Sequence, residues 1–166
     1  MKFVKRMLSF VLVLVMMWAI AVPAFALDSE WRYEFRNQFP LLSQGSTKRD
    51  YISALQSFLS VYPGASTYIA NAGGIDGTYG AGTYNAVRVF QTDAKRDYIS
   101  TMTVDGIAGG DTWASIAMAL RVNGDYFQYN GTNVMRKGTY NQKLSLFYRN
   151  GGYTYFHTIV GYIPEY

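Results

Sequence analysis

Two aspartates are the residues whose type and spacing could do chemistry in this chain. Asp76 and Asp105 each precede a glycine and lie 29 positions apart (105 − 76). A repeated segment could place them on related faces, as a pair of carboxylates of the kind that hydrolyses glycosides. An aspartate before glycine in a turn, however, usually accepts hydrogen bonds from the amides that follow it. We therefore expect these two carboxylates to hold turns rather than to cleave bonds.

The rest of the chain offers little equipment for catalysis. Its glutamates, Glu30, Glu34 and Glu165, lie near the ends, its single histidine is His157, and it contains no cysteine. One histidine cannot supply the ligands of a zinc site, and a chain without a thiol has no cysteine–histidine pair. We predict no catalytic residue, no metal site and no cofactor, so the chain is not expected to be an enzyme.

The two aspartates belong to a repeated segment. Residues 75–84 read IDGTYGAGTY and residues 104–113 read VDGIAGGDTW. Each copy has an apolar residue before Asp-Gly, a glycine three residues later, and then threonine followed by an aromatic residue. Glycine accepts the positive φ of a tight turn, and threonine suits the first turn of a helix. The pattern predicts the same unit, a turn leading into a helix, built twice.

Three amphipathic helices are predicted to carry these turns. The first covers about 49–62, the second about 83–95, and the third follows the second turn and ends near Asn123; a loop is expected over 65–74. Apolar residues at helical spacing form the expected inner faces: Ile52, Leu55, Phe58, Leu59 and Tyr62; Ala86, Val87, Phe90 and Ala94; Trp113, Ile116, Ala117 and Leu120. Three such helices can bury one another's apolar faces.

The sequence after Gly124 changes to alternating aromatic and polar residues. Asn130-Gly131 and Asn150-Gly151 interrupt this pattern, and Asn-Gly between such runs is a strong hairpin signal. We predict strands near 125–129, 133–137, 143–149 and 153–162 in a small antiparallel meander. The predicted fold class is α+β, a small helical domain with two repeated Asp-Gly turn/helix units followed by this meander.

The first 26 residues are expected to be a signal peptide. Basic residues precede an apolar run over 7–22, and Ala24 and Ala26 form a small-x-small cleavage pattern. An uncleaved anchor is the alternative, but the run is shorter than the roughly 20 residues of a membrane span. Cleavage removes three of the fifteen Lys and Arg, which leaves twelve against eleven acidic residues. We therefore expect no nucleic acid partner and no membrane association after cleavage.

Five ordered motifs point to a known family. They are Leu41-Leu42-Ser43-Gln44-Gly45-Ser46; Ala54-Leu55-Gln56 with Leu59; Ile75-Asp76-Gly77 with Gly80 and Thr83; Ala86-Val87-Arg88-Val89-Phe90-Gln91; and Val104-Asp105-Gly106-Ile107 with Gly109, Thr112 and Trp113. In these motifs the helical part resembles a peptidoglycan-binding domain of the three-helix type, found beside bacterial cell-wall hydrolases. The resemblance covers about half the chain, and Ala81 and Gly110 stand where such domains often have proline.

The resemblance implies a secreted, non-catalytic protein that associates with the cell wall by binding peptidoglycan, through its glycan or its stem peptide. The expected organisation is a signal peptide at 1–26, an N-terminal segment at 27–38, a peptidoglycan-binding-like helical domain at 39–122 and a C-terminal β-hairpin extension at 123–166. A shallow groove beside the two turns is the expected binding site. Its expected ligand-binding residues are Gln56, Asp76, Gly77, Tyr79, Tyr84, Gln91, Asp105, Gly106 and Trp113.

Several of these site residues have a second interpretation. Gln56 and Gln91 could hydrogen-bond the backbone of the turns, or they could bind acetamido groups and peptide stems with amides that both donate and accept. The aromatic residues Tyr79, Tyr84 and Trp113 could be core residues or sugar-stacking faces. Because Tyr79 lies in the middle of a turn, we expect it to be the best exposed of the three.

An alternative function places the working surface elsewhere in the chain. In this hypothesis the helical domain is an extracytoplasmic scaffold, and the aromatic β-meander binds a protein by adding a strand to its sheet. A cell-wall hydrolase is the expected partner if the chain acts as a regulator. The two hypotheses differ in whether wall binding or partner binding depends on the meander.

Overall fold

The computed structural model describes residues 35–37, 39–123, 126–137, 143–150 and 153–162. The predicted signal peptide at 1–26 and most of the N-terminal segment at 27–38 lie outside these residues. Among the described residues, no helix is both long enough and apolar enough to span a membrane.

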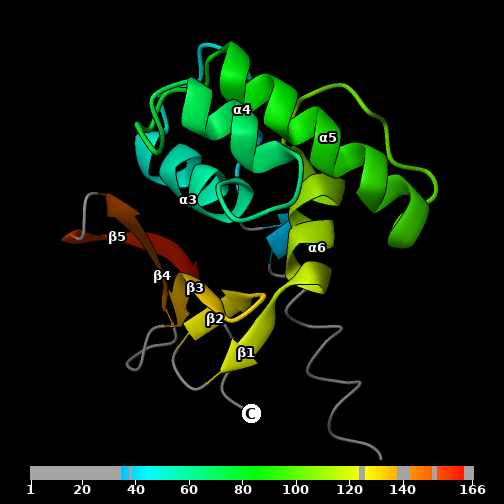
Figure 1. Ribbon diagram of the computed structural model, residues 1–166. Helices are drawn as coiled ribbons and strands as arrows, with labels where there is room; N and C mark the ends of the chain where they lie inside the picture. The colour runs from blue at the N-terminus through cyan, green and yellow to red at the C-terminus, as the bar shows by residue number, and fades with distance from the viewer. Residues whose placement is uncertain (1–34, 38, 124–125, 138–142, 151–152, 163–166) are drawn as a thin grey trace, which may run out of the picture. The chain divides into compact units, whose positions relative to one another are not determined.

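Four helices carry the repeated turns (Figure 1): α3 (Arg49–Leu59), α4 (Ala65–Asn71), α5 (Ala81–Asp97) and α6 (Gly110–Ala119). Helix α3 packs on α4 and α5, and α5 packs on α4 and α6. The close approach of α4 and α5 depends on Gly82, since a Cβ there would lie 2.3 Å from the Cβ of Ala72. Glycine is the one residue that leaves room for this approach.

The predicted inner faces of the helices are confirmed. Every apolar residue expected on them is buried, including Trp113 in α6, Phe58 in α3 and Phe90 in α5, whose side chains are fully enclosed. Phe58 and Phe90 meet edge to face with ring centroids 5.1 Å apart. Such aromatic contacts add to the hydrophobic stabilisation that burial provides.

The C-terminal part forms a five-stranded antiparallel sheet in the order β1-β2-β3-β4-β5, which confirms the α+β class and adds one strand, β1, to the four predicted for the meander. Its strands are β1 (Arg121–Asn123), β2 (Tyr126–Tyr129), β3 (Thr132–Lys137), β4 (Lys143–Asn150) and β5 (Tyr153–Tyr162). Asn130 (φ 47°) and Gly131 (φ 77°) both have positive φ between β2 and β3. This is the tight hairpin turn that Asn-Gly favours.

The structure corrects two of the predicted element boundaries. The loop expected over 65–74 contains helix α4, which buries only Ala65 and Ile69 and is too short for a clear periodic pattern. The third helix ends at Ala119 rather than near Asn123, because the chain enters β1 at Arg121. No glycine or proline stands between Ala119 and Arg121, so the sequence does not mark this helix end.

Aromatic rings and one hydrogen bond join the sheet to the helices. A row of rings leads from Trp113 to Phe39 (4.5 Å), from Phe39 to Phe35 (4.6 Å) and from Phe35 to Phe127 of β2 (5.5 Å). Elsewhere, the Ser57 hydroxyl of α3 donates to the carbonyl of Val134 in β3 at 3.0 Å. These contacts pack strands β2 and β3 against the helical domain.

Candidate functional site

Gln56 of α3 holds the first Asp-Gly turn through both the nitrogen and the oxygen of its side-chain amide. Its Nε2 donates to Asp76 Oδ1 (2.8 Å), to the Thr78 carbonyl (3.1 Å) and to Thr83 Oγ1 (3.0 Å). Its Oε1 accepts from the backbone amides of Asp76 (3.1 Å) and Gly77 (2.9 Å). The side chain is 2 % exposed. The amide is therefore fully engaged within the chain.

Gln91 of α5 repeats this arrangement at the second turn. Its Nε2 donates to Asp105 Oδ1 (3.0 Å), to the Ile107 carbonyl (2.9 Å) and to Thr112 Oγ1 (3.1 Å). Its Oε1 accepts from the amides of Asp105 (3.1 Å) and Gly106 (2.8 Å). The two repeats are thus equivalent in hydrogen bonding as well as in sequence.

The two aspartates close their own turns, as their position before glycine predicts. Oδ1 of Asp76 accepts the amide of Thr78 at 2.8 Å, and Oδ1 of Asp105 accepts the amide of Ile107 at 2.9 Å. Both residues are exposed. Each carboxylate therefore shapes a turn while remaining at the surface.

The glycines of the two turns are required by backbone conformation and by space. Gly77 has φ +70° and Gly106 has φ +71°, a region that side chains with a Cβ rarely adopt. A Cβ on Gly106 would lie 2.4 Å from the ring of Tyr84, and one on Gly77 would lie 3.1 Å from Ser53 Oγ. The first turn therefore lies directly against α3, and the second lies directly against α5.

The first residues of α5 and α6 also match closely. Gly80, before α5, has φ −93° and ψ −168°, and Gly109, before α6, has φ −97° and ψ −169°. Thr83 Oγ1 donates to the Thr78 carbonyl (3.2 Å), as Thr112 Oγ1 donates to the Ile107 carbonyl (3.3 Å). Two copies of one turn-into-helix unit are therefore present.

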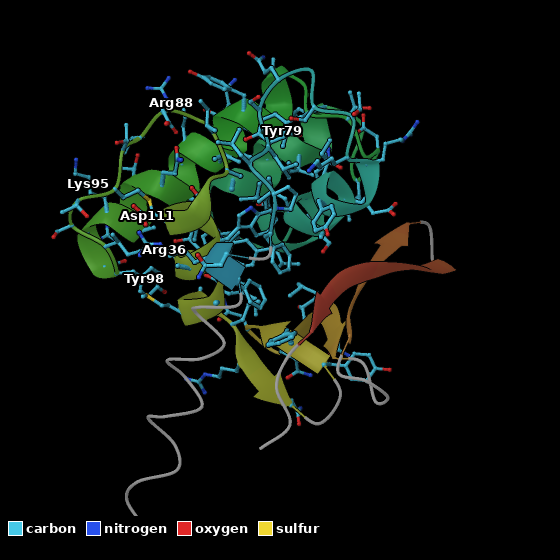
Figure 2. The ribbon with its side chains drawn as sticks, turned by 180° about the vertical axis from the view of Figure 1, so that it is seen from behind. Arg36, Tyr79, Arg88, Lys95, Tyr98 and Asp111 are labelled. Atoms are coloured by element: carbon cyan, nitrogen blue, oxygen red, sulfur yellow. The ribbon has the colours of Figure 1, made fainter. Side chains whose placement is uncertain are left out.

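The expectation that Tyr79 is exposed is wrong. The residue is 3 % exposed, and its hydroxyl donates to the carbonyl of Gly106 at 2.7 Å. Figure 2 shows Tyr79 within the helical part of the chain. A mid-turn position suggested solvent contact, but its partner belongs to the other turn, 27 residues later. Tyr79 links the two turns directly.

Replacing Tyr79 by phenylalanine is expected to lower the free energy of unfolding by about 1 kcal/mol, since one buried hydrogen bond is lost. Burial also raises the pKa of Tyr79 above its ordinary value of 10.0. The folded chain therefore keeps the proton that the unfolded chain loses, and stability falls as the pH rises above about 10. Urea unfolding at neutral and alkaline pH should show a smaller alkaline loss in Tyr79→Phe than in the native chain.

The matched control for this prediction is Tyr68→Phe, because Tyr68 is 42 % exposed. This control should leave the stability at neutral pH unchanged. An equal effect of the two substitutions would show that the bond from Tyr79 to Gly106 contributes nothing measurable.

The remaining two aromatic candidates differ in exposure. Trp113 is completely buried, and its indole Nε1 donates to the carbonyl of Pro40 at 2.9 Å, so it is a core residue. Tyr84 is half-buried and lies against Gly106. Of the three aromatic residues, Tyr84, on α5 beside the second turn, is the one that reaches the surface.

Two arginines beside the turns were not among the predicted site residues. Arg49 of α3 donates from its guanidinium to the carbonyl of Asp76 at 3.0 Å. The guanidinium of Arg88 lies over the Tyr84 ring, 5.8 Å from its centroid, and Figure 2 shows Arg88 projecting outward from α5. They lie at different spacings from the glutamines, seven residues before Gln56 and three before Gln91, so the repeat gave no signal for them.

In the part of the chain that the structure describes, no group of three or more histidine, cysteine, aspartate or glutamate side chains could hold a metal ion. The geometry around Asp76 and Asp105 is that of two structured turns with exposed carboxylates, and His157 lies on β5 opposite Leu146 of β4.

The comparison with protein families finds a match in the helical part. Residues 48–116 match the model of the family described as "Putative peptidoglycan binding domain". The predicted resemblance is therefore confirmed over a segment that contains both Asp-Gly turns, both glutamines and the helices from α3 to Ile116. This family is one of binding domains, and it indicates peptidoglycan as the ligand class and the cell wall as the place of action.

No curated protein and no solved structure matches the chain. The five-stranded sheet lies beyond the matched residues. The match falls inside the helical domain predicted at 39–122, and the domain boundaries themselves stay predictions.

Proposed function

We propose that the chain is a secreted protein that binds peptidoglycan without cleaving it, and that the surface around its two turns is the binding site. The family match over 48–116 is the observation that carries this proposal. The paired turns support the choice of site, because a five-bond amide network fixes each of them before any ligand arrives. A site that is already ordered loses less conformational entropy on binding.

The nine predicted ligand-binding residues take two different parts in this proposal. Asp76, Asp105 and Tyr84 reach the surface and would contact the ligand. The buried residues would act by holding that surface in place: Gln56, Gly77, Tyr79, Gln91, Gly106 and Trp113. Their hydrogen-bonding groups have partners inside the chain, so direct contact with a ligand would require opening the turns.

A shallow site of this kind is expected to bind weakly. Wall polymers present many copies of one unit, so contacts of roughly micromolar to millimolar affinity can hold a protein in place through effective concentration. The predicted signal peptide supplies the route to the wall in this proposal. Binding without catalysis accords with the sequence, which offers neither a thiol nor a second histidine.

Sedimentation with purified insoluble peptidoglycan tests the proposal. The chain without its predicted signal peptide should appear in the pellet, and the wall should release no soluble fragments during the incubation. Insoluble cellulose is the control polymer, since it has glucan chains but neither N-acetyl groups nor peptides. Protein that stays in the supernatant with both polymers would contradict wall binding, and soluble muropeptides in the supernatant would contradict a non-catalytic role.

The alternative role of the sheet stays a prediction. The scaffold or hydrolase-regulator hypothesis assigns partner binding to the aromatic meander, and the sheet does lie outside the matched family segment. Phe127 and Val134 in β2 and β3 are buried, so these two positions are engaged within the chain. The outer strand β5 would then be the candidate contact for a partner protein.

A further inference from the structure

We propose that Arg49 and Arg88 bind carboxylates of the peptidoglycan stem peptides, so that the turn surface recognises the peptide rather than the glycan. This inference rests on the proposed function and names the part of the polymer that is bound. It starts from the position of one guanidinium beside each of the two turns.

Arg49 lies on α3 and Arg88 on α5, the helices against which the first and the second turn pack. Gly77 lies against α3, where its nearest neighbours are Ser53 Oγ and the carbonyl of Arg49. Gly106 lies against α5, where its nearest neighbour is the ring of Tyr84, over which the Arg88 guanidinium is placed. Both arginines are exposed. Equivalent turns thus each have a cationic side chain at their outer edge.

Neither guanidinium is neutralised within the described part of the chain. The ion pairs found there involve other arginines, namely Arg36 with Asp111 and Arg96 with Asp93 and Asp97. Figure 2 shows Arg36 beside Asp111, in contrast to Arg88, which projects outward. Arg49 uses one nitrogen on the Asp76 carbonyl and retains other donors. A guanidinium has five N–H donors, so both residues can accept a carboxylate.

The negative charges of the turns leave both arginines able to bind a carboxylate. Asp76 and Asp105 are the acidic residues at the turns, and Oδ1 of each already accepts a backbone amide and a glutamine amide. No ion pair joins either aspartate to Arg49 or Arg88 among the described residues. Recognition would therefore depend on direct contact at the guanidinium more than on long-range attraction, which salt screens.

The chemistry of the polymer favours the stem peptide over the glycan as the ligand of the two arginines. Stem peptides have free carboxylates, whereas the N-acetylated sugars of the glycan strand are uncharged. Arginine binds carboxylate through two parallel hydrogen bonds, a geometry that a sugar hydroxyl or acetamide does not match. Stacking over Tyr84 limits the motion of Arg88, and the half-buried ring offers an adjoining apolar surface.

Sedimentation with two forms of peptidoglycan tests this inference. One form is native, and in the other the carboxyl groups are converted to amides with carbodiimide and ammonia. The native chain should bind the amidated form about tenfold more weakly, the combined effect of two exposed charged contacts of about threefold each. Arg88→Gln should bind native peptidoglycan about threefold more weakly, and the double variant with Arg49→Gln should not distinguish the two forms.

Lys95→Gln is the matched control, because Lys95 is an exposed basic residue on the same helix α5 and its loss changes the net charge equally. It should bind both polymers like the native chain. Arg49→Gln removes a hydrogen bond to the first turn, so thermal unfolding is compared for all variants. If Arg49→Gln proves to lower stability, the binding of Arg88→Gln alone tests the inference. Arg88→Gln removes no hydrogen bond from the guanidinium to the described residues.

Equal binding of the native chain to native and amidated peptidoglycan would overturn the inference while leaving wall binding intact, and so would unchanged binding by Arg88→Gln. Equal weakening by Lys95→Gln would also overturn it, because net charge rather than position would then decide. Failure of the native chain to sediment with native peptidoglycan would overturn the proposed function together with this inference. The two failures are therefore distinguishable in one experiment.

Discussion

Gln91→Ala is expected to lower the free energy of unfolding by about 3 kcal/mol, measured by urea denaturation. The substitution removes a side chain that is 1 % exposed and makes five hydrogen bonds to the second turn and the start of α6. It leaves the backbone amides of Asp105 and Gly106 without their partner, whereas the Ile107 carbonyl still accepts from the amide of Gly109. Each buried polar group that loses its partner costs about 1 to 3 kcal/mol. Gln56→Ala should behave similarly, because its network is equivalent.

Gln44→Ala is the control for this prediction. Gln44 is exposed, so the same change of side chain should alter stability by less than about 0.5 kcal/mol. If Gln91→Ala were as mild as Gln44→Ala, water would be replacing the lost bonds, and the turn would be less enclosed than the structure indicates. A large effect at only one of the two glutamines would show that the repeats differ energetically despite their equivalent geometry.

Phe35→Ala is expected to lower the free energy of unfolding by about 3 to 4 kcal/mol, the usual range for a buried phenylalanine. Phe35 is completely buried and stacks on Phe39 on one side and meets Phe127 of β2 on the other. Its removal leaves a cavity between the helical domain and the sheet. Urea unfolding gives the loss, and hydrogen exchange of the β2 amides should become faster in the variant.

Leu41→Ala provides the comparison for Phe35→Ala. Leu41 is close in sequence but 65 % exposed, so its truncation should change stability only slightly. Equal unfolding curves for Phe35→Ala and the native chain would mean that the sheet does not depend on the row of rings. Faster exchange in β2 without a change in overall stability would instead mean that the sheet opens independently of the helices.

The repeated turns could be predicted because their determinants are local. Asp-Gly, the glycine three residues later and the following threonine specify a turn and a helix start within a few residues, and the structure has both. The sequence alone allows the two glutamines either to hydrogen-bond the backbone of the turns or to bind a ligand. Gln56 bonds residues 20 to 27 positions away, and sequence spacing alone does not indicate which groups such a side chain will meet.

The features that could not be predicted depend on distant contacts or weak patterns. Tyr79 has a turn-like position, but it is buried by its contact with Gly106 in the other repeat. Phe35 lies in a polar stretch without periodicity, and its burial depends on Phe127, far along the chain. Helix α4 buries two residues only, which is too few to separate a short helix from a loop.

The spacing of the glutamines also explains why the series stops at two units. Gln91 follows Asp76 by 15 residues, and the residue 15 positions after Asp105 is Leu120. Leu120 is apolar and buried, so it has no amide with which to clasp a third turn, and β1 begins at the next residue. The helix after the second turn therefore offers no glutamine to a third turn, and the chain continues into the sheet instead.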